Sequence, residues 1–119
     1  MRHCSVHTAC RIIGIGNSLV YSDSAGPETL RMLDSMNIDG DIELIDGGLG
    51  GLNLLPVLEH VDRVIFIDSV DGFLDGPGIT VFCLPSEKVK PGEYDHNAGL
   101  GYLMSVAPII IDTPMPECW

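Results

Sequence analysis

Apolar residues along the chain fall into short runs whose spacing alternates between that of strands and that of helices. The apolar runs predict strands at residues 11–16, 41–46, 63–68, 79–84 and 109–112. The spacing of Leu30, Leu33 and Met36 predicts a helix at about 27–36. Further helices are expected at 52–60, where Pro56 disturbs the first turn, and at 96–104. This alternation indicates a three-layer α/β/α fold with a mostly parallel, roughly five-stranded sheet.

The polarity of the runs predicts where each strand lies in that sheet. Residues 63–68 are almost continuously apolar, as expected for a central strand covered on both faces, whereas residues 41–46 alternate as a strand near an edge does. The first ten residues are polar and are predicted to form a flexible leader. The 119 residues contain no internal repeat or linker, so residues 1–119 are expected to form a single domain.

The charge balance narrows the range of partners. Seventeen acidic against six basic side chains give a formal net charge of −11, and the acidic residues are spread along the chain. Such a surface repels phosphate backbones and anionic lipid, which argues against nucleic-acid and membrane-surface binding. A cation or a basic peptide is easier to accommodate.

Neither membrane insertion nor secretion is indicated. No apolar run reaches the roughly 18 to 20 residues that span a bilayer, and the N-terminus lacks the apolar core of a signal peptide. The four cysteines, Cys4, Cys10, Cys83 and Cys118, have irregular spacings and are expected to be free thiols. We therefore expect a cytoplasmic protein.

Acidic residues follow the carboxyl ends of the predicted strands, which is where open parallel sheets bind their ligands. Asp23 lies in the loop after the first strand, Asp46 and Asp68 end the second and third, and His96 opens the helix after the fourth. Carboxylates gathered there would repel one another unless a cation joined them. We therefore infer a divalent transition-metal site of Asp23, Asp68 and His96, with Asp46 nearby. The alternative is that these aspartates only cap the turns that follow the strands.

Other kinds of site fit the sequence less well. Gly14 and Gly16 resemble the start of a dinucleotide fingerprint, but Leu19 occupies the third glycine position and Asp23 would repel a phosphate. No Gly-Lys-Ser/Thr motif and no Gly-x-Ser-x-Gly elbow is present. A zinc site is conceivable at the N-terminus, but its spacing fits no established structural zinc site; its candidate ligands are His3, Cys4, His7 and Cys10.

A series of short motifs resembles the hydrogenase maturation endopeptidases, from about residue 11 to 104. In chain order the motifs are Gly14-Ile15-Gly16-Asn17-Ser18-Leu19, Ser22-Asp23-Ser24-Ala25-Gly26, Asp46-Gly47-Gly48, the strand ending in Asp68, and His96-x-x-Gly99-Leu100. The resemblance implies an endopeptidase that removes the C-terminal extension of a nickel–iron hydrogenase large-subunit precursor after nickel insertion.

The resemblance also implies roles for individual residues. The carboxylate metal ligands of the family fall on Asp23 and Asp68, and its histidine ligand falls on His96. The nickel would be supplied by the substrate precursor, and other divalent metals could substitute for it. Asp46 is the candidate catalytic residue, either as a base or as a group that orients the peptide.

This sequence departs from the family pattern in two places. Ser22 stands where the family commonly has the first of two acidic residues, and the chain stops at Trp119, where family members usually continue into a further helix. A sheet face left partly bare there would favour self-association, so a homodimer is one expectation. A non-catalytic metal- or hydrogenase-binding relative is the alternative function.

Overall fold

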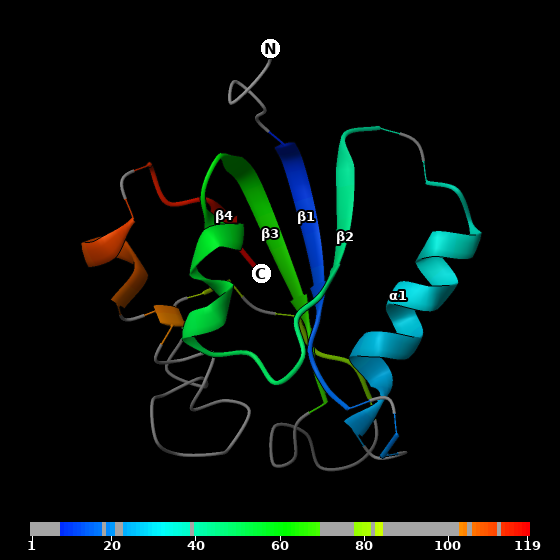
Figure 1. Ribbon diagram of the computed structural model, residues 1–119. Coiled ribbons are helices and arrows are strands. Elements are labelled where there is room, and N and C mark those ends of the chain that lie inside the picture. Colours follow the sequence, from blue (N-terminus) through cyan, green and yellow to red (C-terminus); the bar gives the residue numbers. More distant parts are fainter. Residues whose placement is uncertain are drawn as a thin grey trace.

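The computed structural model describes residues 8–17, 19–20, 23–38, 40–69, 78–81, 83–84, 103–104, 106–111 and 113–119. In chain order, its named elements are β1 (Thr8–Gly14), α1 (Ala25–Ser35), β2 (Ile42–Asp46), the 3-10 helix η2 (Leu52–Leu58), β3 (Val61–Ile67) and β4 (Glu117–Cys118). The strands form one sheet in the order β2-β1-β3-β4, and every neighbouring pair is parallel (Figure 1). The predicted α/β fold with a mostly parallel sheet is confirmed.

The two faces of the sheet are covered by different elements. On one face, Gly14 of β1 lies against Gly26 and Leu30 of α1. On the other, Ile13 of β1 belongs to a buried cluster with Leu58 of η2 and Val64 of β3. Because successive side chains of a strand point to opposite faces, β1 is covered on both of them. The apolar runs in the carboxyl-terminal parts of the two inner strands, Ile12–Ile13 of β1 and Val64–Ile67 of β3, match such a covered position.

The C-terminal part of the sheet differs from the prediction. Residues 78–81 are not in a strand, and Leu84 makes only an isolated antiparallel bridge with Cys118, so the strand predicted at 79–84 is wrong in the described residues. The strand predicted at 109–112 is also wrong, because residues 106–110 are helical. The strand beside β3 is instead β4, and Trp119 extends its pairing by donating from N to the Val64 oxygen (2.9 Å).

The N-terminal boundary of the sheet also lies earlier than predicted. β1 begins at Thr8, inside the predicted leader, where Thr8 is buried and its N–H donates to the His60 carbonyl (2.9 Å). Residues 1–7 and most of the helix predicted at 96–104 lie outside the described residues, although residues 103–104 are helical. The leader predicted for the first ten residues is therefore wrong for residues 8–10, which belong to β1 because their backbone groups pair with neighbouring strands.

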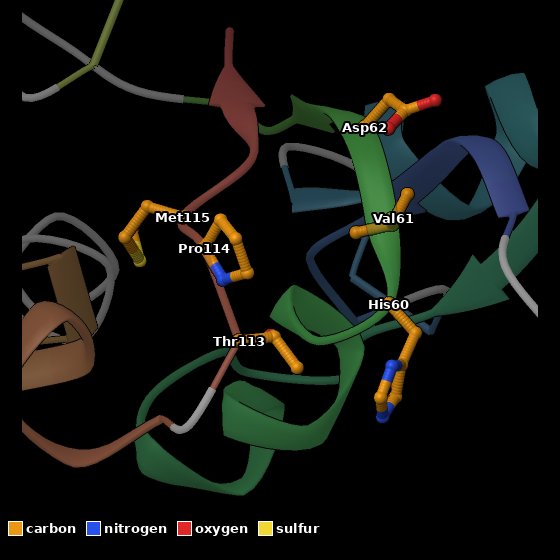
Figure 2. A pocket seen from close by; sticks show the side chains of 6 residues that line it. All are labelled: His60, Val61, Asp62, Thr113, Pro114 and Met115. Atoms are coloured by element: carbon orange, nitrogen blue, oxygen red, sulfur yellow. The ribbon is translucent and has the colours of Figure 1, made fainter.

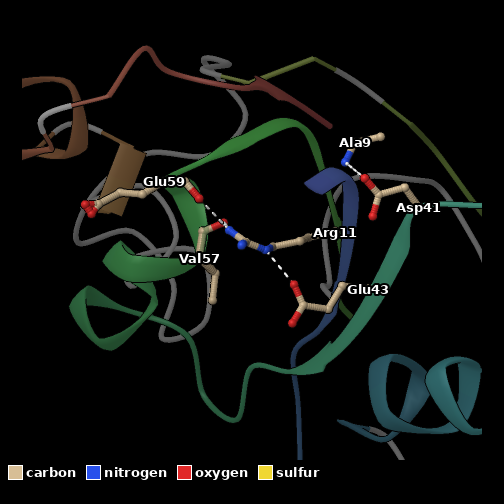
Figure 3. A network of polar contacts seen from close by, with 6 residues as sticks. All are labelled: Ala9, Arg11, Asp41, Glu43, Val57 and Glu59. Atoms are coloured by element: carbon tan, nitrogen blue, oxygen red, sulfur yellow. Dashed lines mark hydrogen bonds and ion pairs between the residues drawn. The ribbon is translucent and has the colours of Figure 1, made fainter. Parts of the chain in front are cut away.

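Arg11 ties three elements together from the middle of β1 (Figure 3). Its Nε donates to Oε1 of Glu43 on β2 (2.8 Å), and its Nη1 donates to the carbonyl oxygens of Val57 (2.9 Å) and Glu59 (2.7 Å) at the end of η2. The Arg11 side chain is only 14% exposed. A charge this shielded is tolerated because several acceptors surround its guanidinium.

Replacing Arg11 by methionine is expected to lower the free energy of unfolding by about 2 to 3 kcal/mol, because the Val57 and Glu59 carbonyls lose a charged donor. Urea unfolding followed by circular dichroism measures the change. Arg63→Met is the matched control, since the Arg63 side chain is 56% exposed in its ion pair with Glu117 and should cost less than about 1 kcal/mol. Equal losses in the two variants would contradict this role of Arg11.

Two further observations bear on the sequence predictions. Cys10, Cys83 and Cys118 are free cysteines, as predicted, and Cys4 lies outside the described residues. No helix within the described part of the chain is long and apolar enough to cross a membrane.

Candidate functional site

The carboxyl ends of β1, β2 and β3 bring the predicted acidic residues to one edge of the sheet. The strand register places Asp46 of β2 and Ile67 of β3 level with Gly14 of β1, so Asp68 begins the loop directly after β3. Neighbouring strands lie about 4.8 Å apart, so the ends of β2 and β3 flank β1 at about 10 Å from each other. The predicted position of Asp46 and Asp68 is confirmed.

Asp23 sits directly over the end of β1. Its Oδ2 accepts a hydrogen bond from the Asn17 N–H (3.0 Å), and its own N–H donates to the Val20 carbonyl (2.9 Å). Gly16 has a φ of +141°, and a β-carbon there would overlap the carbonyl of Asp23. Only glycine adopts this conformation readily and permits so close an approach, so Gly16 is what lets the loop return Asp23 to the strand end.

A second glycine joins the loop of Asp23 to the end of β3. A β-carbon on Gly26, in the first turn of α1, would lie 2.5 Å from the Ile15 nitrogen and 2.7 Å from the Ile67 oxygen. The same two strand ends are connected directly, since the Ile15 N–H donates to the Ile67 carbonyl (2.8 Å). Asp23 and Asp68 are therefore carried by neighbouring strand ends that α1 holds together. Sequence reasoning missed this role of Gly26, although its position just after the acidic loop was the available signal.

Asp46 is held by the turn that it initiates. Its Oδ1 accepts from the Gly48 N–H (3.0 Å), the pattern of an Asx-turn, and the residue is exposed. Two hydrogen bonds of 2.8 Å connect the turn to the end of β1 and the residues just after it. Gly47 N–H donates to the Gly14 carbonyl, and Gly16 N–H donates to the Gly48 carbonyl. The sequence left two interpretations of Asp46 open, a turn cap and a functional residue. The contact with Gly48 is that of a turn cap, and the position of Asp46 at the carboxyl edge fits both interpretations.

Asp68 is more enclosed than Asp46. Its Oδ1 accepts from the Ser69 N–H (2.7 Å), and its Oδ2 is shielded from solvent. Each of the three aspartates thus uses one carboxylate oxygen to accept a backbone N–H from the loop or turn that follows a strand. Such bonds fix the orientation of a carboxylate, which is what a ligand for a cation requires.

The predicted metal site has two of its three ligands in the described residues. Asp23 and Asp68 are described, whereas His96 lies outside the described ranges. Among the described residues no three His, Cys, Asp or Glu side chains approach closely enough to hold a metal ion, so Asp23, Asp46 and Asp68 do not form such a site by themselves. The metal site of Asp23, Asp68 and His96 stays a prediction, and so does the catalytic role of Asp46.

Two of the described thiols are poorly suited to nucleophilic chemistry. Burial raises the pKa of Cys118 to about 11, and the neighbouring Cys83 and Glu117 add to the effect. Burial also raises the pKa of Cys10, although the Arg63 charge opposes the shift. Because the thiolate is the reactive form, both residues are poor nucleophiles at neutral pH.

A shallow pocket of about 230 Å³ lies elsewhere (Figure 2). It is formed by His60, Val61 and Asp62 at the amino end of β3 and by residues 113–115. Strand β3 separates it from the carboxyl edge that carries Asp68. The pocket is therefore distinct from the predicted site.

Comparison with known proteins gives a consistent family assignment. The family model described as hydrogenase maturation protease matches residues 28–115, a range that includes Asp46, Asp68 and His96 and begins after Asp23. The hydrogenase expression/formation protein HupD of Rhodobacter capsulatus is 38% identical over 72 residues, 59% of this chain and 34% of its own. A relative from Methanocaldococcus jannaschii, whose name refers to the same family, is 35% identical over 96 residues, 75% of this chain and 60% of its own.

A solved structure has the same fold. The hydrogenase maturating endopeptidase HybD from E. coli superposes with a TM-score of 0.73 and 24% identity, and the match covers 93% of this chain and 70% of that one. The chain spans between 34% and 60% of the length of the curated relatives named above.

Proposed function

The chain belongs to the hydrogenase maturation protease family, and we propose on that premise that it is an endopeptidase that removes the C-terminal extension of a nickel–iron hydrogenase large-subunit precursor. The observation that carries the proposal is the placement of Asp23, in the loop that returns to the end of β1, and of Asp68, directly after β3, with each carboxylate accepting a backbone N–H. Two oriented carboxylates on one rim suit a divalent cation, and the family match supplies the class of substrate.

In this proposal nickel is part of the substrate. Asp23, Asp68 and His96 contact the nickel already inserted in the precursor, which locates the scissile bond relative to the rim. A metal ion in this position polarises a carbonyl or lowers the pKa of a water molecule. Asp46 lies across β1 from Asp68 and is exposed, so its proposed role is to orient the peptide or accept a proton.

The location of the protein follows from the same proposal. A precursor is processed where it is assembled, and we expect that to be the cytoplasm. The free thiols of Cys10, Cys83 and Cys118 agree with a reducing compartment.

The decisive experiment compares two forms of one substrate. The full chain is incubated with nickel-loaded and nickel-free large-subunit precursor from the same source, and release of the tail is followed by intact mass. Release from the loaded form alone is the expected result. Binding of the precursor without release from either form would instead identify a non-catalytic relative, and release from both forms would refute the dependence on nickel.

A further inference from the structure

The outer edge of β2 carries features that the proposed chemistry does not use. β2 is the outermost strand of the sheet, and among the described residues it pairs only with β1 (Figure 1). The Asp41 carbonyl accepts from Cys10 N–H (3.2 Å), and Gly47 N–H donates to the Gly14 carbonyl. The backbone N–H and C=O groups of the odd-numbered residues from 41 to 47 therefore point toward β1. The alternation of a parallel ladder then directs the N–H and C=O groups of Ile42, Leu44 and Asp46 outward.

An open groove runs beside these outward-facing groups. It has a volume of about 410 Å³ and lies between the C-terminal half of α1 and β2. Its apolar lining comes from Leu33, Ile38, Ile42 and Leu44, with Asp34 and Glu43 among its polar residues. Every second side chain of a strand placed beside β2 would point toward the α1 face, where this groove could receive it.

Exposed apolar side chains also occur on α1 and β2, the two elements that flank the groove. Met32 of α1 and Met36, the C-cap residue of α1 one turn later, are 64% and 66% exposed, and Ile42 is 37% exposed. Methionine side chains adapt to varied partners, which suits a surface that binds a peptide. The edge therefore offers backbone groups and apolar contacts along the same line.

The charge of the edge selects the kind of partner. The groove lining includes Asp34 and Glu43 but no lysine or arginine, and Asp41 and Asp46 stand at the two ends of β2. Arg11 offsets part of the charge of Glu43 from the inner side of the strand. With a net charge of −11, a second copy of the chain would bring like charges together, whereas a segment with basic residues would meet opposite charge.

The outer edge of β2 also leads to the predicted metal site. β2 runs from Ile42 to Asp46, and four steps of about 3.3 Å carry an added strand roughly 13 Å to the carboxyl edge. A polypeptide paired along β2 would therefore arrive beside Asp46 and the rim that carries Asp23 and Asp68. We infer that the outer edge of β2 binds an extended, basic segment of the substrate polypeptide by strand addition, an inference that rests on the proposed function.

The test uses a peptide whose backbone can be altered without changing its side chains. The ¹⁵N-labelled full chain is titrated with a short peptide of alternating lysine and valine, and then with the same peptide methylated at its amide nitrogens. We expect the unmodified peptide to shift the amide signals of Ile42, Leu44 and Asp46, and the methylated peptide to bind at least about tenfold more weakly because it cannot donate to the edge. Equal affinity, or shifts confined to other elements, would overturn the inference.

Charge is tested separately. A peptide of alternating glutamate and valine should not bind, and Asp34→Lys should weaken binding of the lysine peptide several-fold. Asp62→Lys is the matched control, because Asp62 is exposed on β3, which is separated from β2 by β1, and should leave binding unchanged. Binding of the acidic peptide, or equal effects of the two substitutions, would also overturn the inference.

A parallel assay of precursor processing separates the two proposals. Tail release by the wild-type chain with no binding of the lysine peptide at β2 would refute strand addition and leave the proposed function standing. Peptide binding at β2 with no tail release from any precursor would refute the endopeptidase while supporting a peptide-binding edge. Sedimentation of the free chain as a dimer held through β2 would replace the substrate with a second copy and overturn the inference.

Discussion

Replacing Gly26 by alanine is expected to destabilise the protein by about 3 kcal/mol or more. A β-carbon there would lie 2.5 Å from the Ile15 nitrogen and 2.7 Å from the Ile67 oxygen, which are backbone atoms just after β1 and at the end of β3. To relieve this overlap, α1 must move away from the sheet, and that movement would also loosen the loop that carries Asp23. Helix propensity alone predicts the opposite sign, since alanine is favoured over glycine inside a helix by about 1 kcal/mol.

The measurement is urea unfolding of the wild-type chain and of two glycine variants. Gly48→Ala is the control, because no atom lies within 4 Å of a β-carbon at Gly48 and its φ of +58° adds only a modest backbone cost, about 1 to 2 kcal/mol for an alanine. A Gly26→Ala protein that is as stable as the wild type would show that α1 does not pack this closely on the ends of β1 and β3.

Replacing His96 by alanine is expected to abolish removal of the tail while leaving the fold intact. His96 is the proposed third contact to the nickel of the precursor, and two carboxylates alone make an incomplete set for a borderline metal. Mutation of a residue that only hydrogen-bonds to a metal ligand lowers metal affinity or activity by about 10- to 100-fold. Loss of the ligand itself should therefore reduce the rate of tail release by more than about 100-fold. Intact mass measures the released tail, and circular dichroism checks the fold.

Two comparisons make the result specific. Asp23→Asn and Asp68→Asn should give losses similar to that of His96→Ala if the three residues act on one metal. His60→Asn should process normally, because His60 lies at the amino end of β3 and its φ of +60° is one that asparagine tolerates. Normal processing by His96→Ala would remove that residue from the proposed site.

Local patterns in the sequence determined the first half of the fold. The strands predicted at 11–16, 41–46 and 63–68 correspond to β1, β2 and β3, and the helix predicted at about 27–36 corresponds to α1. Pro56 lies inside η2, which is a 3-10 helix rather than an α-helix. These elements could be predicted because each buries apolar residues at its own period, and that period is visible in neighbouring residues.

The position of the acidic residues could be predicted for a related reason. Parallel strands expose their carboxyl ends at the same edge, so strand order along the chain is enough to bring Asp23, Asp46 and Asp68 to one rim. The contacts that hold them there could not be predicted. They depend on close approaches at Gly16 and Gly26, which involve segments that the sequence does not show to be neighbours.

The sequence by itself thus determined the fold class, the edge that carries the acidic residues and, through its motifs, the family. Tertiary structure alone decided that residues 8–10 join β1, that residues 106–110 form a helix and that Glu117–Cys118 is the strand beside β3. The flanking Pro114 and Pro116 indicate a turn locally, yet Trp119 pairs with Val64 and Phe66 and Cys118 is buried. The physical reason is that a short strand is stabilised by the backbone groups and apolar surface of its neighbour, which residues distant in the sequence supply.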